Sequence, residues 1–227
     1  MITAIIPARG GSKSIRKKNL VNVCGKPLVE WTIEQALSSE LVDRVIVSSD
    51  CHEIGAVSQA VGAEWIMRSD ETASDTATSE SALIEVLDNL DEQPELVVFL
   101  QPTSPIRQPD DIDNCIRTMW NETADSCFSA RYVEGYTWTL GETLTPNYWD
   151  RRRRQTQSVA RLEENGSIYV FKPDVLRTQN KRLGGKITFC EMHPLDSFQV
   201  DVPKDLELIS DLMQLRLGVQ PLTYTAI

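Results

Sequence analysis

Short apolar runs alternate with stretches of helical periodicity along the first half of the chain. The apolar runs predict buried strands at Ile2–Ile6, Val45–Val47, Glu64–Met67 and Leu96–Leu100. The periodic stretches predict helices at about 28–37, 52–61, 79–90 and 110–120, with Gly62 ending the second and Asp110 or Asp111 capping the fourth. Strand–helix alternation of this kind predicts an α/β, Rossmann-like fold, in which helices cover both faces of a mostly parallel central sheet.

The pattern is less regular after residue 124. Strands are predicted at 127–132, 167–171 and 187–192, and a last helix near Pro203. Residues 133–162 lack periodicity and combine aromatic side chains with an arginine run: Tyr136, Trp138, Tyr148, Trp149 and Arg151–Arg154. Aromatic residues beside arginines are typical of subunit contacts. We therefore predict a single domain, 1–227, with a dimerisation or substrate-pocket insert at 133–162.

Polar clusters follow four of the predicted strands. They lie at 9–19, 48–50, 68–79 and 101–107, and the stretch 68–78 is expected to be a loop. In open α/β sheets, ligands bind beyond the carboxyl ends of the strands. We therefore expect the four clusters to meet at one edge of the sheet.

The first cluster is strongly basic, although the chain has a formal net charge of -10. Its cations are Arg9, Lys13, Arg16, Lys17 and Lys18. Such a local reversal of sign indicates a polyanionic ligand. Gly10 and Gly11 are expected to let backbone N–H groups turn outward, as a phosphate-binding loop requires.

The composition argues against several other classes of protein. The acidic balance disfavours general binding to nucleic acids or membrane surfaces. The five cysteines are scattered and form no C-x-x-C pair, and two histidines are too few for a histidine-based metal site. No apolar stretch approaches the roughly 20 residues that span a bilayer. We expect a reduced, cytoplasmic protein.

Several segments occur in the order typical of a known family. They are residues 5–13, Lys18-Asn19, Ser74–Thr76, Leu100–Pro105, Asn165–Tyr169 and Val200-Asp201. Together they resemble the CMP-sialic acid synthetases, or acylneuraminate cytidylyltransferases. The resemblance implies a nucleotide-diphospho-sugar transferase fold, a homodimer, and transfer of CMP from CTP to the anomeric hydroxyl of a nonulosonic acid, with release of pyrophosphate.

The resemblance also implies roles for individual residues. Lys18, Arg9 and Asp201 would act in catalysis, with Asp201 holding Mg²⁺. The nucleotide would be bound by Ala8, Arg9, Gly10, Gly11, Ser12, Asn19, Arg68, Ala77 and Ser79. The sugar acid would meet Gln101, Arg154, Asn165 and Tyr169, and the Arg154 guanidinium would grip its carboxylate.

Two positions depart from the family pattern. Gln199 stands where an aspartate is usual, so one carboxylate of the metal motif is missing, and the number of metal ions stays open. Arg16-Lys17 replaces a common Pro-Gly pair. The arginine run leaves open which member meets the sugar carboxylate, and it could instead be a solvated face or a dimer contact. Asp201 could instead be a helix cap.

Other functions remain open at this stage. A CMP-Kdo synthetase would carry Asp-Glu-Pro where Thr103-Ser104-Pro105 stands. A different sugar nucleotidylyltransferase is a further alternative. A non-catalytic nucleotide-sugar-binding protein is favoured only by Gln199. The residues do not decide which nonulosonic acid would be used or how a dimer would be arranged.

Overall fold

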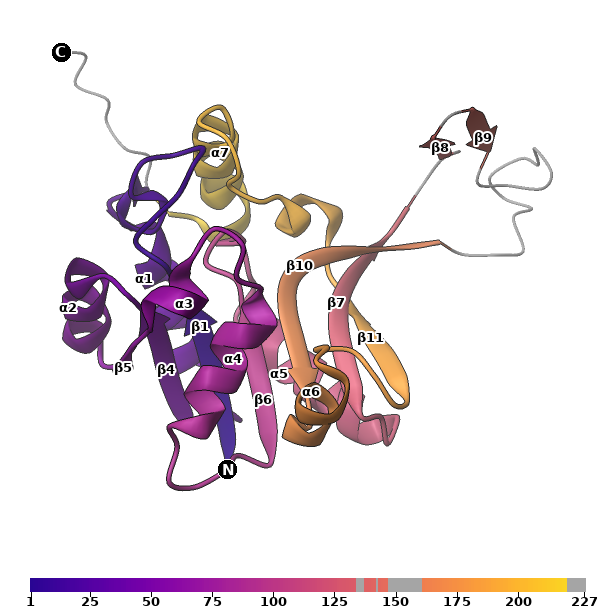
Figure 1. Cartoon of the computed structure of the whole chain (residues 1–227). Helices are drawn as coiled ribbons and strands as arrows, with labels where there is room; N and C mark the ends of the chain where they lie inside the picture. Colours follow the sequence, from indigo (N-terminus) through magenta and orange to yellow (C-terminus); the bar gives the residue numbers. More distant parts are fainter. Residues whose placement is uncertain (134–136, 142, 147–160, 220–227) are drawn as a thin grey trace, which may run out of the picture.

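The computed structural model describes residues 1–133, 137–141, 143–146 and 161–219. Within them, one seven-stranded sheet has the order β11-β7-β10-β6-β1-β4-β5 (Figure 1). Its strands, in chain order, are β1 (Ile2–Pro7), β4 (Arg44–Ser49), β5 (Glu64–Met67), β6 (Leu96–Leu100), β7 (Ser126–Tyr132), β10 (Leu162–Phe171) and β11 (Ile187–Glu191). The predicted strands of the first half are confirmed.

The sheet is mostly parallel, as predicted. The central strand β1 pairs in parallel with β4 and β6, so that Ile5 lies between Ile46 and Phe99. Strand β10 is antiparallel to both of its neighbours, β6 and β7. The register between β10 and β7 shifts between Glu164 and Tyr169, at a bulge that contains Gly166 with φ +69°. Since φ is positive there, glycine suits this position.

Helices cover both faces of the sheet (Figure 1). On one face pack α1 (Leu28–Leu37), α2 (His52–Val61) and α5 (Asp111–Asn121). On the other pack α4 (Ser79–Asp88) and α6 (Pro173–Gln179). Helix α7 (Asp205–Leu217) forms a third cluster with the start of α1 and the short strands β2 (Asn22–Val23) and β3 (Lys26–Pro27). Because apolar side chains point from both faces of the central strands, both faces need a covering layer.

Three boundaries differ from the sequence prediction. The expected loop at 68–78 contains a short helix, α3 (Asp70–Ala73), because the Ser69 hydroxyl caps the N–H of Thr72. The last helix begins at Asp205 rather than Pro203, since Asp205 accepts hydrogen bonds from the N–H groups of Asp201 and Val202. Strand β10 begins at Leu162, well before the predicted start, because its first residues pair with β7.

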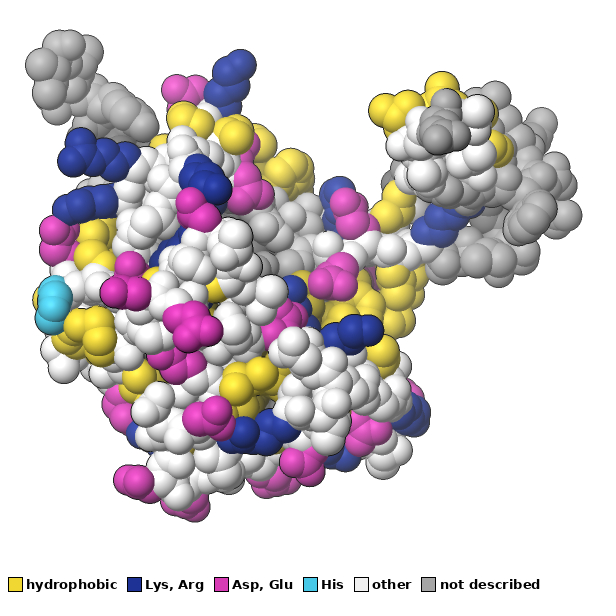
Figure 2. All heavy atoms as spheres, viewed as in Figure 1, with side chains coloured by type: hydrophobic (Ala, Val, Ile, Leu, Met, Phe, Trp, Pro, Cys, Tyr) yellow, Lys and Arg dark blue, Asp and Glu magenta, His cyan; other side chains and the backbone are white. Residues whose placement is uncertain are grey.

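Strands β7 and β10 continue past the rest of the sheet towards the hairpin of β8 (Trp138–Leu140) and β9 (Leu144–Pro146) (Figure 1). Hydrophobic side chains are exposed on this hairpin, including Trp138, Leu140 and Leu144 (Figure 2). The predicted insert at 133–162 includes the hairpin. Most of its remainder, with Arg151–Arg154, lies outside the described residues.

Candidate active site

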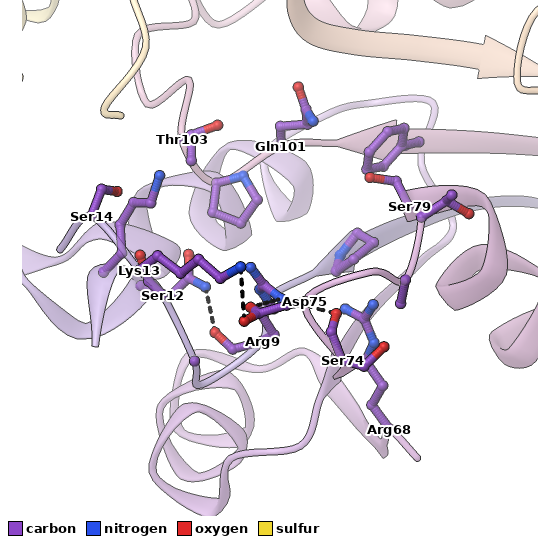
Figure 3. Close-up of a pocket in the computed structure, with 18 residues that line it drawn as sticks. Arg9, Ser12, Lys13, Ser14, Arg68, Ser74, Asp75, Ser79, Gln101 and Thr103 are labelled. Atoms are coloured by element: carbon purple, nitrogen blue, oxygen red, sulfur yellow. Dashed lines mark hydrogen bonds and ion pairs between the residues drawn. The ribbon is translucent and has the colours of Figure 1, made fainter. Parts of the chain in front are cut away.

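A pocket of about 400 Å³ lies where β1 and β6 end (Figure 3). Its wall includes nine of the predicted site residues: Arg9, Gly11, Ser12, Lys18, Asn19, Arg68, Ala77, Ser79 and Gln101. Three of the four polar clusters, those after β1, β5 and β6, therefore meet at one sheet edge, as expected. The fourth, at 48–50, does not line the pocket, although Asp50 accepts a hydrogen bond from the Gly10 N–H. Lys13, Asp75, Phe99 and Thr103 also line the pocket but were not among the predicted site residues.

Two loop cations face one carboxylate across the pocket. Arg9 Nη1 lies 3.0 Å from Asp75 Oδ1, and Lys13 Nζ lies 3.1 Å from Asp75 Oδ2 (Figure 3). Arg9 also donates to the Ser74 carbonyl at 3.0 Å. The Lys13 and Arg9 cations lower the pKa of the exposed Asp75 carboxyl group. Asp75 is therefore ionised at neutral pH. It neutralises the charges of Arg9 and Lys13, as a bound phosphate group would.

Lys18 reaches from the short helix η1 (Lys18–Leu20) to the segment before α7. Its ammonium donates to the Val200 carbonyl at 3.0 Å and lies 3.3 Å from Asp201 Oδ1. The Lys18 side chain is only 15% exposed, whereas that of Asp201 is 67% exposed. Asp201 is not a helix cap, because Asp205 makes the hydrogen bonds that precede α7.

Lys17 points elsewhere. Its backbone is left-handed, with φ 52°, and its ammonium pairs with Glu53 at 2.6 Å. The cations of the loop are thus divided between the pocket wall and the outer surface.

At Gly10 the loop backbone differs from the expectation. The Gly10 N–H donates to Asp50 Oδ1 at 2.7 Å and is not turned towards the pocket. Gly10 is needed for close packing, since an added Cβ would lie 2.8 Å from Cys51 Cβ. Gly11 has open space around its Cα and lines the pocket. Ala8 is fully buried, and its N–H donates to the Ser48 carbonyl within the sheet.

The opposite wall comes from Arg68 after β5, the connection between α3 and α4, and the start of α4. Arg68 is 7% exposed and donates to the Thr72 carbonyl, and burial lowers the pKa of its guanidinium. Ser79 begins α4, where the Thr78 hydroxyl accepts from the Ser81 N–H at 3.1 Å. A helix start offers backbone N–H groups to an anion. On the first wall, Asn19 Nδ2 donates to the Arg9 carbonyl at 2.9 Å and ties the loop together.

Gln101, at the end of β6, is held through its backbone. Arg107 donates to the carbonyls of Gln101 and Ser167 at 2.8 and 3.0 Å. Arg107 is 2% exposed, and burial lowers the pKa of its guanidinium to about 9, so it stays charged at neutral pH. In the sequence, Arg107 is only one member of the polar cluster at 101–107. Its position shortly after a strand that ends at the ligand edge was the available signal.

Gln199 and Gln101 lie on either side of the bulge at Gly166. An added Cβ on Gly166 would lie 2.2 Å from Gln199 Nε2 and 2.8 Å from Gln101 Oε1. Gln199 Nε2 donates to the Asn165 carbonyl at 2.5 Å. An aspartate has no N–H to donate, so glutamine suits this contact.

Asn165 and Tyr169 do not line the pocket, contrary to expectation. Asn165 is 4% exposed, and its Oδ1 accepts from the Ser129 hydroxyl at 2.5 Å. Tyr169 is 3% exposed and stacks on Phe99, with 5.4 Å between the ring centroids. Both side chains are turned into the protein. Tyr169 supports Phe99, which lines the pocket, whereas the Asn165 side chain contacts Ser129 and Ser197, which do not. Arg154 lies outside the described residues.

Metal ligands are sparse in the described part of the chain. No group of three or more His, Cys, Asp or Glu side chains is placed there to hold a metal ion. Among the described helices, none has the length and apolar character needed to cross a bilayer.

The comparisons with known proteins agree with this geometry. A family model described as Cytidylyltransferase matches residues 3–224. An N-acylneuraminate cytidylyltransferase A of Danio rerio is 33% identical over 96% of this chain and 51% of its own length. A CMP-N,N'-diacetyllegionaminic acid synthase of Legionella pneumophila is 30% identical over 94% of this chain and 97% of its own length. The chain thus spans about half the length of several relatives that it matches.

A solved structure of a CMP:2-keto-3-deoxy-manno-octonic acid synthetase complexed with CTP has the same fold. Its TM-score is 0.71 at 21% identity, over 94% of this chain and 98% of that one. The nucleotidyltransferase fold is therefore confirmed. With a family model that covers nearly all of its residues, the chain belongs to the cytidylyltransferase family.

Proposed function

We propose that this protein transfers CMP from CTP to the anomeric hydroxyl of a nonulosonic acid and releases pyrophosphate. The observation that carries the proposal is the meeting of Arg9, Ser12 and Lys18 with Gln101 in one pocket. Relatives named for N-acylneuraminate, legionaminic acid and pseudaminic acid support this class of acceptor.

The reaction needs positioning and neutralisation of charge more than covalent chemistry by the protein. The anomeric hydroxyl attacks the α-phosphorus of CTP, and the bond from that phosphorus to the bridging oxygen of the pyrophosphate breaks. Arg9 and Lys13 exchange Asp75 for phosphate oxygens. Lys18 stabilises charge at the α-phosphate. Its side chain is the least exposed of the loop cations that line the pocket, and it lies beside Asp201.

We propose Mg²⁺ as the metal ion. Mg²⁺ is usually held by one or two carboxylates together with substrate phosphates, and the exposed Asp201 carboxylate, which pairs with the pocket-lining Lys18, fits that donor set. Gln199 cannot supply a second charge, and it is already engaged with Asn165. When bound, the ion would neutralise phosphate charge. Asp201 would then exchange its ion pair with Lys18 for a bond to the metal ion.

Gln101 is the proposed contact to the sugar acid, since it lines the pocket at the end of β6, away from the pair of Arg9 and Asp75 (Figure 3). We keep an arginine of the run 151–154 as the carboxylate ligand of the same acid. The exposed hairpin β8–β9 supports a homodimer in which this arm packs on a second copy. All five cysteines are free, which supports a reducing, cytoplasmic setting.

One assay tests the proposal. The protein is incubated with CTP, Mg²⁺ and each of a panel of nonulosonic acids or Kdo, and pyrophosphate release is measured. Release with a nonulosonic acid is expected, and calorimetry should show CTP binding. Release with Kdo alone would move the protein to the CMP-Kdo synthetases. CTP binding without release from any acid would indicate a non-catalytic binding protein, and absence of CTP binding would overturn the proposal.

A further inference from the structure

A cluster of ionisable side chains lies behind the Phe99 wall of the pocket. It consists of Glu80, Glu164, Tyr169 and Arg182. Glu80 directly follows Ser79, which lines the pocket, and Arg182 lies between α6 and β11. None of the four was needed to explain nucleotide binding.

Arg182 is fixed by two rings and one carboxylate. Its guanidinium carbon lies 4.6 Å from the Tyr169 ring centroid and 5.2 Å from that of Phe99. Its Nε lies 3.1 Å from Glu80 Oε1. A guanidinium stacked on aromatic rings keeps the edge of its plane free for hydrogen bonds. Arg182 is therefore oriented in advance, as a ligand-binding arginine needs to be.

The hydrogen bonds of this arginine are incomplete. Its Nη1 atom is buried and has no hydrogen-bond partner among the described residues. Buried donors in native proteins usually have a partner, so such a group calls for an explanation. The side chain as a whole is 24% exposed and that of Glu80 17%, so both reach the surface next to the pocket wall.

The charges of the cluster indicate what kind of group it would bind. One cation stands with two carboxylates, and the Tyr169 hydroxyl donates to Glu164. Burial and Glu164 raise the pKa of that hydroxyl, so it stays protonated. A cluster with a net negative charge would repel the carboxylate of a ligand. It suits neutral groups, since the carboxylates accept from hydroxyl and amide N–H groups and Arg182 donates to a carbonyl.

We propose that Arg182, together with Glu80, is a specificity-determining part of the acceptor site that binds the hydroxyl and acylamido substituents of the sugar acid. This inference rests on the proposed function, because the ligand is the acceptor of that reaction. Phe99 and Ser79 adjoin this cluster and line the same pocket as the phosphate loop, so one extended acid would meet both regions.

Two acids that differ in one substituent test the inference. N-acetylneuraminate carries an acetamido group where its deaminated counterpart carries a hydroxyl group. KM and kcat are measured for both acids with wild type, Arg182→Met and Arg182→Lys. Arg177→Met is the control, since Arg177 on α6 pairs with Asp88 at 2.6 Å outside the pocket lining.

The expected result is a change in acid recognition alone. Arg182→Met should raise KM for the preferred acid about tenfold, the effect of one lost hydrogen bond, and change the kcat/KM ratio of the two acids about fivefold or more. CTP affinity should stay within about twofold, as it should in the control. If Arg182→Met does not fold, Arg182→Lys keeps the charge and should still alter the ratio.

Two outcomes separate the inference from the proposed function. Wild-type turnover with an unchanged ratio and KM in the Arg182 variants would show that Arg182 only braces the rings, and would overturn the inference. If wild type releases no pyrophosphate, the proposed function fails first. Saturation-transfer NMR of each acid with the CTP-bound protein then decides whether Arg182→Met changes acid binding; equal signals in wild type and variant would overturn the inference.

Discussion

Two sides of the pocket hold their polar side chains in different ways. On the side of the phosphate loop, called the phosphate wall, Arg9, Lys13 and Lys18 are paired with the exposed carboxylates of Asp75 and Asp201. The other side, called the β6–β10 wall, is lined by the end of β6 and backed by β10. There Gln101 in the lining and Gln199 behind it are tied to buried partners, among them the guanidinium of Arg107.

The difference shows which parts of the site can exchange partners. Exposed ion pairs contribute about 0–1 kcal/mol, so a triphosphate can replace them at little cost. A buried hydrogen bond that loses one partner costs about 1–3 kcal/mol, so that wall keeps its shape when ligands come and go. We infer that the phosphate wall exchanges its ion-pair partners when a ligand binds, whereas the β6–β10 wall keeps its shape.

The largest expected effect is on turnover at the phosphate wall. Lys18→Ala should lower kcat about 100-fold or more, because it removes a cation from the reacting phosphate. Steady-state kinetics with CTP and the best acid would measure it, and thermal unfolding would check the fold. Lys17→Ala is the matched control, since Lys17 pairs with Glu53 outside the pocket. Equal losses in both variants would contradict a specific role for Lys18.

The next effect is on stability at the β6–β10 wall. Arg107→Met leaves the carbonyls of Gln101 and Ser167 without their donor, and should lower the free energy of unfolding by about 2–4 kcal/mol. Urea unfolding would measure the loss. Arg177→Met is the control: Arg177 is a partly exposed arginine whose partners, Asp88 and Gln93, lie at the surface, so a change within about 0.5 kcal/mol is expected. Similar values for both variants would mean that this wall is not rigidly held.

Gln199 tests whether the missing carboxylate has a structural reason. Gln199→Asp places an acceptor against the Asn165 carbonyl and should cost about 1–3 kcal/mol of unfolding free energy. Gln199→Met also loses the donor but adds no charge, so it should be the milder change. Unfolding is measured without metal. An aspartate variant as stable as wild type would show that position 199 needs no hydrogen-bond donor. The glutamine would then have no structural reason, and an aspartate at this position could join a metal site.

The smallest effect concerns Asp75. Because Asp75 competes with phosphate for Arg9 and Lys13, Asp75→Asn should tighten CTP binding up to about fivefold, in line with weak surface ion pairs. Calorimetry at low salt would detect the change. Asp88→Asn, which removes an exposed pair with Arg177, should leave CTP affinity unchanged. Weaker CTP binding in Asp75→Asn would place Asp75 among the groups that hold the nucleotide.

Local sequence pattern was enough to predict the parallel half of the sheet and the edge at which the pocket lies. Apolar runs and helical periodicity depend on local residues, and they predicted β1, β4, β5 and β6 with helices α1, α2 and α4, but not the short helix α3. The rule that ligands bind at the carboxyl ends of strands then placed Arg9, Lys18, Arg68 and Gln101 together, and the pocket confirms that placement.

The contacts of each polar group depend instead on how distant segments pack. Gly10 turns its N–H to Asp50, and the Asn165 side chain bonds Ser129 on the neighbouring strand β7. Arg107 meets the Ser167 carbonyl, and Arg182 meets Glu80 across about a hundred residues of sequence. Local pattern carries no information about such long-range partners, since they depend on how the strands and helices pack, and packing selects which of many equivalent polar residues faces the site.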